Sequence, residues 1–423
     1  MPSVTGEHRL QLYNTLTRER QPFVPLEGRR VKIFTCGPSI YGIPHIGNYR
    51  TFLYEDVLQR YLEYLGYAVE RVVNFTDVED KAIARAGKSR EKLEEITEKA
   101  AEEFFRNTGL LHIRVPDFIP RSSTSVDGAV EIVGRLLAGG YAYRHGDDIF
   151  YDPLKFAGFG KLFGLDMTRW PKQKKRFRLD TYEGKRWNRG DFILWHGYRA
   201  ERDGDIFWET ELGRGRPAWN VQDAAMIFKH LGLRIDIACG GIDNLYRHHD
   251  YTIAIMEPLS GRTFANYWLH GEHVLLNGKK MSKSKGNILY PLDLLDKGMS
   301  AVALRYYLIA GHYRQPLNLT EKRLKEGEER CRALRDLVRQ LTGPEVGWGC
   351  GDPLVDRNID ALVEDFEKAM NDDLGVGAAC AALHARLVEL VSWKSRGCLG
   401  KEQAAGIRKH LLRIDAVLQI LFE

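Results

Sequence analysis

The chain has 423 residues, of which 44% are hydrophobic and 28% are charged, and its formal net charge is +5. This length and composition are typical of a globular protein with roughly two to four domains, and they exclude a disordered or fibrous chain. A net charge this small permits an anionic partner but does not by itself indicate nucleic-acid binding.

The six cysteines are too few and too scattered for a disulfide framework, so we expect reduced thiols or metal ligands. No apolar run looks long enough to span a bilayer, and the first residues, MPSVTGEHRL, lack the apolar core of a secretory signal. We therefore expect a cytoplasmic protein without a membrane partner.

The first elements predict a βαβ unit. Residues 31–36 (VKIFTC) form a β-branched run that ends at a Gly- and Pro-rich loop, and residues 49–66 follow with apolar side chains at helical spacing. Residues 67–75 again predict a strand, and a long helix rich in Glu and Lys is expected from about Lys88 to Asn107. This order is the usual beginning of a parallel sheet.

Residues 116–208 break this pattern, and we interpret them as an insertion. They predict a helix at 125–138, a hairpin at 142–152 and a basic segment, KQKKRFR, at 172–178. The basic segment is typical of a solvated surface or of a contact with RNA or phosphate.

The parallel-sheet pattern resumes with a helix at 222–231 and a strand at 233–239, followed by a helix after GGIDNLYRHHD. Helices are expected near 291–310 and 321–342. After a Gly- and Pro-containing break, residues 355–423 show three helical patterns with Leu, Ala and Val stripes, which are typical of a small bundle. The sequence therefore predicts an α/β fold whose parallel sheet is split by an insertion.

Two segments carry residue types that bind phosphate. His45, in PHIGN, lies where the first strand gives way to a helix, and ligands of parallel sheets bind beyond the carboxyl ends of the strands. The segment KKMSKSKGN at 279–287 carries four lysines, whose ammonium groups could close over a triphosphate. The alternatives are a turn or cap histidine and a solvated basic loop.

Taken together, HIGN and KMSKS resemble the two signature motifs of class I aminoacyl-tRNA synthetases, His-x-Gly-His and Lys-Met-Ser-Lys-Ser. The resemblance implies that these segments bind ATP with Mg²⁺ while an amino-acid carboxylate attacks the α-phosphate, producing an aminoacyl adenylate and pyrophosphate. Asn48 stands at the position of the second histidine, where it can donate a hydrogen bond but carries no charge.

The resemblance also assigns residues to the nucleotide. The catalytic residues it implies are His45, Asn48, Lys280 and Lys283. The ATP-binding residues it implies are Gly37, His45, Gly47, Asn48, Gly240, Gly241, Asp243, Lys280, Met281, Ser282 and Lys283. In CGGID, the two glycines would admit the nucleoside closely and Asp243 would meet the ribose hydroxyls.

Within this class the chain is similar to cysteinyl-tRNA synthetases, through stretches such as TCGPSIYGIPHIGNYRTF, NFTDVEDKAIARA, GDFILWH, GRGRPAWN and FEKAMNDDLG. That family binds zinc through two Cys, one His and one Glu. Cys36 and His248 match two of these ligands, whereas Asp223 stands for the second Cys and Thr252 for the Glu.

Two interpretations of this altered set stay open. Cys36, Asp223 and His248 could hold zinc, with a substrate thiolate as the fourth ligand and Cys239 as a substitute ligand. Alternatively, Asp223 could pair with a cationic group on a different amino acid. The resemblance adds Thr76 and Trp219 to the amino-acid pocket, for which the alternatives are a structural turn and a core tryptophan.

Cysteinyl-tRNA synthetases continue past the helical bundle into a domain that recognises the anticodon, whereas this sequence stops where the bundle ends. We therefore expect contact with a tRNA acceptor end but no anticodon recognition. The same layout is found in the mycothiol-pathway ligase, which joins cysteine to a small amine without tRNA. A ligase with a small-molecule amine acceptor and a catalytically silent paralogue are the alternatives.

Pattern and resemblance together predict a Rossmann-type catalytic domain followed by helical regions. The expected domains are 1–115 (first half of the catalytic domain), 116–208 (connective insertion), 209–290 (second half, with the lysine-rich loop), 291–345 (helical stem-contact region) and 355–423 (C-terminal helical bundle).

Overall fold

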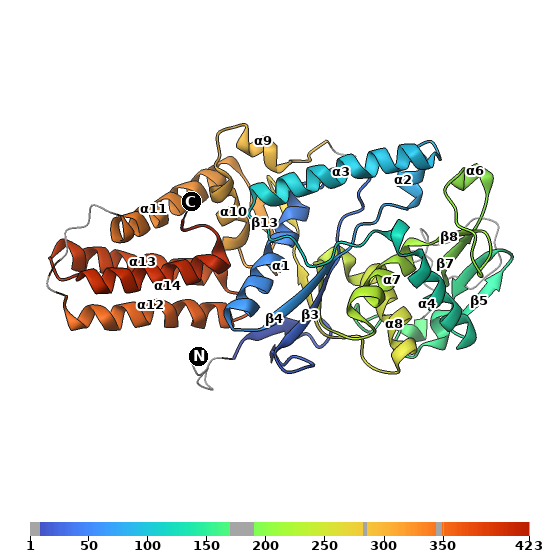
Figure 1. Ribbon diagram of the computed structural model, residues 1–423, viewed down its shortest axis with the longest axis horizontal. Coiled ribbons are helices and arrows are strands. Elements are labelled where there is room, and N and C mark those ends of the chain that lie inside the picture. The colour runs from blue at the N-terminus through green and yellow to red at the C-terminus, as the bar shows by residue number, and fades with distance from the viewer. Residues whose placement is uncertain (1–8, 170–189, 282–285, 344–348, 350, 423) are drawn as a thin grey trace.

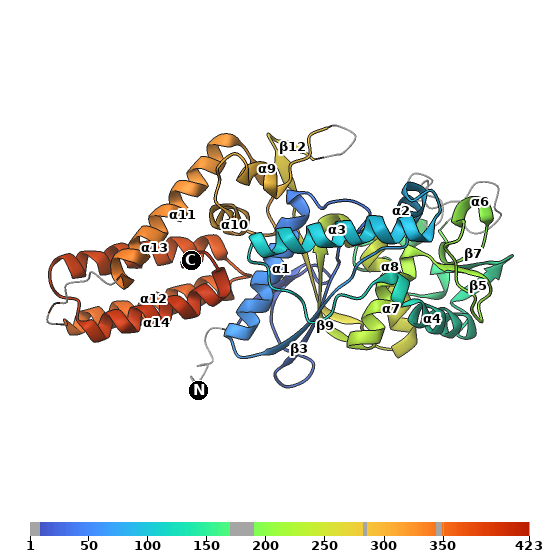
Figure 2. The ribbon, with the colours of Figure 1, turned by 45° about the horizontal axis from the view of Figure 1, so that its top comes forward.

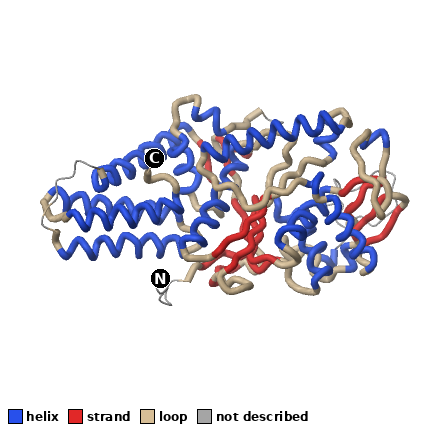
Figure 3. Tube along the Cα trace, viewed as in Figure 1, coloured by secondary structure: helices blue, strands red, loops and turns tan. Residues whose placement is uncertain are grey.

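The computed structural model describes residues 9–169, 190–281, 286–343, 349 and 351–422. A parallel sheet lies at the centre of the molecule, a helical bundle at one end and a second sheet at the other (Figure 1). Strands are gathered at the centre and at the end opposite the bundle (Figure 3). The predicted α/β fold with a parallel sheet is confirmed.

The described strands are β1 (Gln11–Asn14), β2 (Glu19–Pro22), β3 (Arg30–Thr35), β4 (Ala68–Val73), β5 (Ala142–His145), β6 (Asp148–Tyr151), β7 (Phe192–Gly197), β8 (Gly215–Pro217), β9 (Ile235–Gly241), β10 (Ala265–Gly271), β11 (Val274–Leu276), β12 (Lys279–Lys280) and β13 (Leu317–Leu319). The described α-helices are α1 (Ile46–Tyr64), α2 (Asp80–Arg85), α3 (Arg90–Leu110), α4 (Val126–Ala138), α6 (Ala200–Asp203), α7 (Trp219–Leu231), α8 (Asp250–Ser260), α9 (Pro291–Leu295), α10 (Ala301–Ala310), α11 (Glu321–Thr342), α12 (Pro353–Asn371), α13 (Val376–Ser395) and α14 (Lys401–Leu418).

The central sheet has the strand order β10-β9-β3-β4, and every neighbouring pair is parallel. Strands β3 and β4 precede the predicted insertion and β9 and β10 follow it, so two distant segments of the chain build one sheet. Ile33 lies opposite Ile237 and Thr35 opposite Cys239. The carboxyl ends of β3 and β9 therefore lie side by side, which is where parallel sheets bind ligands.

Alternation along these strands produces two cores. Ile33 and Ile237 contribute to a core shared with α1 and the C-terminal helices, whereas Phe34 and Ala238 contribute to a core shared with α4, α7 and α8. Successive side chains of a strand point to opposite faces, and both faces of a parallel sheet are covered, so both sets are apolar.

The insertion forms its own antiparallel sheet of order β5-β6-β7-β8, and the hairpin predicted at 142–152 is confirmed as β5 and β6. Strand β8 follows residue 208, the expected end of the insertion, yet pairs with β7. The domain boundaries stay predictions, and the basic segment at 172–178 lies outside the described residues.

Helices α12, α13 and α14 form the bundle, with α11 alongside (Figure 2). Among the described helices, α13 is long and apolar enough to cross a membrane by length and composition, although no such run was expected from the sequence. Leu383, Leu387 and Leu390 on this helix are buried in the bundle core. Packing inside the bundle therefore accounts for these three leucines.

A buried ion pair joins α1 to the C-terminal helices. Arg305 donates from Nη2 to Asp56 Oδ2 at 2.7 Å, and both side chains are buried. The same guanidinium donates to the carbonyls of Leu418 and Leu111, both at 2.8 Å. Burial opposes ionisation of Asp56, but the charges of Arg305 and Arg60 outweigh it and lower the pKa of Asp56.

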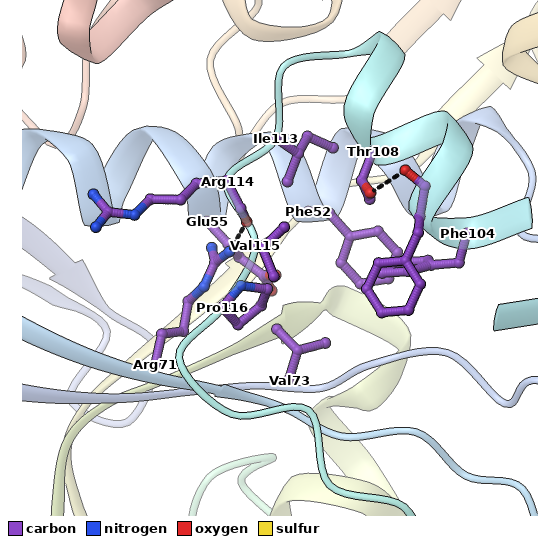
Figure 4. A pocket seen from close by; sticks show the side chains of 11 residues that line it. Phe52, Glu55, Arg71, Val73, Phe104, Thr108, Ile113, Arg114, Val115 and Pro116 are labelled. Carbon is purple, nitrogen blue, oxygen red and sulfur yellow. Dashed lines mark hydrogen bonds between the residues drawn. The ribbon is translucent and has the colours of Figure 1, made fainter. Parts of the chain in front are cut away.

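The carboxyl group of the neighbouring residue, Glu55, is also buried but lacks the hydrogen-bonded ion pair that Asp56 has. Its side chain lines a small cavity together with Phe52, Phe104 and Arg71 (Figure 4), and neither of its oxygens has a hydrogen-bond partner among the described residues. Burial raises the pKa of Glu55 well above its usual range, and the charge of Arg71 offsets this only in part.

We predict that Asp56→Asn lowers the free energy of unfolding by about 3–5 kcal/mol, because it leaves Arg305 buried without a counter-ion. Urea unfolding measures the change. The control is Lys99→Ala, which breaks an exposed ion pair with Glu95 on α3 and should change stability by less than about 0.5 kcal/mol. A loss for Asp56→Asn no larger than the control's would mean that the carbonyl contacts alone hold Arg305.

We predict that Glu55→Gln stabilises the protein increasingly as pH rises above about 4.3, the ordinary pKa of a glutamate. Above that pH the unfolded chain releases the Glu55 proton while the folded chain retains it, so wild-type stability falls by up to about 1.4 kcal/mol per pH unit until the raised pKa is passed. Unfolding of both proteins at a series of pH values tests this. Parallel pH profiles would show that Glu55 titrates normally in the fold.

Candidate active site and metal centre

A cleft of about 340 Å³ opens at the carboxyl ends of β3, β4 and β9. Its walls come from the loop after β3, the first turn of α1, the end of β4, helix α7 and the loop after β9. The predicted site residues that line it are Cys36, Gly37, His45, Asn48, Thr76, Asp223, Gly241, Asp243 and His248. The fold therefore brings together residues that lie more than 200 positions apart.

His45 and Asn48 form the cap of α1. His45 Nδ1 accepts a hydrogen bond from the Gly47 N–H at 3.1 Å, and Asn48 Oδ1 accepts from the His45 N–H at 3.0 Å. An imidazole whose Nδ1 accepts carries its proton on Nε2, and an amide whose oxygen accepts can donate from Nδ2. Both side chains thus carry N–H donors at a helix N-terminus, which favours an anion.

The lysine-rich loop starts and ends near this cap. The Ile46 N–H donates to the Leu289 carbonyl at 2.9 Å, and a Cβ on Gly47 would lie 3.3 Å from Met281 Cε. Lys280 does not line the cleft; its Nζ lies 3.1 Å from His273 Nε2. The predicted residues Ser282 and Lys283 lie outside the described residues, so their roles stay predictions.

The glycine pair after β9 is tightly packed. A Cβ on Gly240 would lie 2.8 Å from His249 Cε1, and the Gly240 carbonyl accepts from the Tyr54 hydroxyl at 2.9 Å. Gly240 therefore lies beneath the cleft, while Gly241 and the exposed Asp243 reach it. Side chains larger than hydrogen would not fit at Gly240 without moving His249.

At the other end of the cleft, Cys36, Asp223 and His248 place their ligand atoms within 4.8 Å of one another. Asp223 is buried on α7, and His248 lies just before α8. Trp219 does not line the cleft; its ring packs against that of His248, with centroids 4.7 Å apart. Burial, and then the charge of Asp223, raise the pKa of the Cys36 thiol well above its usual range, an effect that a cation in the site would oppose.

The chemistry of this donor set fits a zinc ion. Zinc bonds of about 2.0–2.3 Å place tetrahedral donors about 3.3–3.8 Å apart, whereas His248 Nδ1 lies 4.0 Å from Asp223 Oδ2 and the three ligand atoms lie within 4.8 Å of one another. The side chains would therefore move closer together to bind the ion. Thr252 is not a ligand, because its hydroxyl donates to the His248 carbonyl at 2.9 Å. Thiolate, carboxylate and imidazole with one open position are typical of a catalytic rather than a structural zinc site.

Cys239, expected as a substitute ligand, is excluded by its position. Its side chain is buried in the core on the α1 side of the sheet, whereas Cys36 is half-buried in the cleft. The sequence pattern could not show which face of the sheet Cys239 occupies, because the pleat and the pairing with neighbouring strands decide this.

Two cleft residues that contact the candidate ligands were not predicted from the sequence. Asn74 donates from Nδ2 to Asp223 Oδ1 at 2.8 Å, and Asn244 donates from Nδ2 to Cys36 Sγ at 2.9 Å. Asn74 is the residue before the last of the strand predicted at 67–75, so its place near a strand carboxyl end was a signal. No comparable signal marks Asn244.

Residues 22–329 match the family model described as the tRNA synthetases class I (C) catalytic domain. The chain is 38% identical to the cysteine–tRNA ligase of Chlamydia pneumoniae, over 97% of this chain and 86% of that protein. It is 34% identical to the cysteine–tRNA ligase of Protochlamydia amoebophila, over 97% and 86% of the two chains.

Solved structures share the fold at low sequence identity. A Mycobacterium tuberculosis methionyl-tRNA synthetase bound by methionyl-adenylate aligns with a TM-score of 0.64 and 17% identity, covering 93% of this chain and 90% of that one. A leucyl-tRNA synthetase from Agrobacterium radiobacter K84, in a ternary complex, aligns with a TM-score of 0.64 and 13% identity, covering 94% and 85%.

We predict that Gly37→Ala destabilises the protein by about 1–3 kcal/mol, a typical cost of overpacking. A Cβ at this position would lie 1.8 Å from the Asn74 carbonyl oxygen, so the ends of β3 and β4 would have to separate. Gly109→Ala, in α3, is the control, because a Cβ there meets no atom within 4 Å and should be stabilising by about 0.5–1 kcal/mol. Thermal unfolding that ranks the two variants in the reverse order would contradict the geometry.

Proposed function

Because the chain belongs to the class I tRNA synthetases, and within them to the cysteine–tRNA ligases, we propose that it activates cysteine with ATP and Mg²⁺ and transfers it to the 3′ end of a tRNA. One observation carries this proposal: the helix cap formed by His45 and Asn48 lines the same cleft as the thiol, carboxyl and imidazole groups of Cys36, Asp223 and His248.

In the first step a carboxylate oxygen of the amino acid attacks the α-phosphorus of ATP. The new bond joins acyl oxygen to phosphorus, and the bond between the α-phosphorus and its bridging oxygen breaks, with its electron pair leaving on pyrophosphate. His45 Nε2–H and Asn48 Nδ2–H donate to phosphate oxygens as this charge develops. Lys280 and Lys283 are proposed to stabilise the leaving pyrophosphate, which requires Lys280 to leave His273.

The amino-acid side chain is proposed to meet Cys36, Asp223 and His248. Zinc bound by these three residues would supply a Lewis acid whose open position holds the cysteine thiolate and excludes a hydroxyl or methyl group in its place. Thr76 lines the cleft beside them and is available to the amino-acid backbone.

In the second step a ribose hydroxyl of the tRNA 3′ end attacks the acyl carbon, and AMP leaves with the bridging oxygen. The relatives' name, cysteine–tRNA ligase, supports this acceptor. We also propose that the protein is located in the cytoplasm.

ATP–pyrophosphate exchange with each amino acid in turn, followed by transfer assays with tRNA and with free amines, tests the proposal. Exchange with cysteine and transfer to tRNA support it. Exchange with a diamino acid instead would mean that Asp223 pairs with a cation, transfer only to a free amine would favour the small-molecule ligase, and no exchange would favour a silent paralogue.

We predict that His45→Ala lowers the rate of exchange by about 100-fold or more, because one donor to the developing charge is lost. His384→Ala, an exposed position on α13, should leave the rate unchanged. If both variants exchange at the wild-type rate, the helix cap does not bind the reacting phosphate.

A further inference from the structure

Two asparagine side chains lie directly behind the candidate metal ligands. Asn74 reaches Asp223 from the end of β4, and Asn244 reaches Cys36 from the 3₁₀ turn Ile242–Asn244 that follows β9. Both line the cleft.

The orientation of Asn74 is fixed by its other contact. The Gly37 N–H donates to Asn74 Oδ1 at 2.7 Å, and a backbone N–H can only donate, so the oxygen of this amide must face Gly37. The amino group then faces Asp223, whose Oδ1 it binds at 2.8 Å. Asn74 is buried. It therefore occupies one oxygen of the carboxylate and leaves Oδ2, the oxygen nearer to His248, for the site.

Asn244 acts on the sulfur in a similar way. Its Nδ2 lies 2.9 Å from Cys36 Sγ, and an amide N–H that donates to a sulfur lone pair favours the electron-rich form of that sulfur and restricts the directions left for another partner. The loop that carries Asn244 also carries His248, and Arg247 between them has a φ of +71°. This left-handed backbone conformation at Arg247 lets one loop provide both the amide donor Asn244 and the candidate ligand His248.

We propose that Asn74 and Asn244 are positioning residues of the metal centre, which orient Asp223 and Cys36 so that Asp223 Oδ2, Cys36 Sγ and His248 face one cation. This rests on the part of the proposed function that places zinc at these ligands. Outer contacts of this kind typically contribute 10- to 100-fold in metal affinity. The two amides also set where the open fourth position lies, and hence which side chain can occupy it.

The test uses the full chain, stripped of metal and titrated with Zn²⁺ against a chromogenic chelator. Asn74→Ala and Asn244→Ala should each weaken zinc binding by about 10- to 100-fold. The control is Asn220→Ala, because Asn220 is a buried asparagine on the same helix as Asp223 that donates to the Ile193 carbonyl at 2.7 Å rather than to a ligand. It should change affinity by less than about threefold.

A second readout separates positioning from general loss of structure. The absorption spectrum of the Co²⁺ form reports ligand geometry, so it should shift in Asn74→Ala and Asn244→Ala but not in Asn220→Ala, and Asn244→Gln, which retains an amide, should recover part of the affinity. Should Asn74→Ala fail to fold, the half-buried Asn244 still tests the proposal.

Wild-type affinity and spectrum in both alanine variants would overturn the proposal. A wild-type protein that binds neither Zn²⁺ nor Co²⁺ would overturn it together with the zinc assignment, whereas ATP–pyrophosphate exchange in that protein would leave the proposed activation standing. The two failures are therefore distinguishable.

Discussion

The buried contact between Asp56 and Arg305 is the constraint on which the arrangement of the molecule depends. One guanidinium neutralises a carboxylate of α1 and also binds carbonyls at the ends of α3 and α14. Neither charge could remain buried alone, so the three segments must meet at this point. Because α1 begins at the His45 cap, the ion pair that anchors the bundle also fixes the helix whose N-terminus faces the cleft.

The cleft itself follows from the parallel sheet. Ladder pairing of β3 with β4 and β9 brings three strand ends to one edge, although β9 follows β4 only after the insertion. The approach is so close that Gly37 has no room for a side chain beside the Asn74 carbonyl. The same closeness lets the Asn74 amide bridge β3, β4 and α7. The close approach of β3 and β4 therefore determines both the packing of the backbone and the orientation of the side chains in the site.

Much of this could be predicted from the sequence, since helical spacing and β-branched runs located α1, β3 and β9, and a matching motif pointed to Cys36 and His248. These signals are local. The amide of Asn244 binds a residue 208 positions away, and that of Asn74 one 149 positions away, so no local pattern could show them. Cys239 was misplaced for a related reason: which face a strand residue occupies is set by the pleat and its neighbours.

The altered ligand set has a consistent physical meaning. At the position of the fourth ligand, Thr252 turns its hydroxyl to the carbonyl of His248 one helical turn earlier, which satisfies a buried polar group without reaching the site. In the proposed zinc site three protein donors then remain, of which one is the carboxylate of Asp223. A cation held by these donors keeps one open position and has only one sulfur ligand from the protein. Its preference for an incoming thiolate therefore depends more on how precisely the three protein donors are oriented. The two asparagines are the groups that hold them.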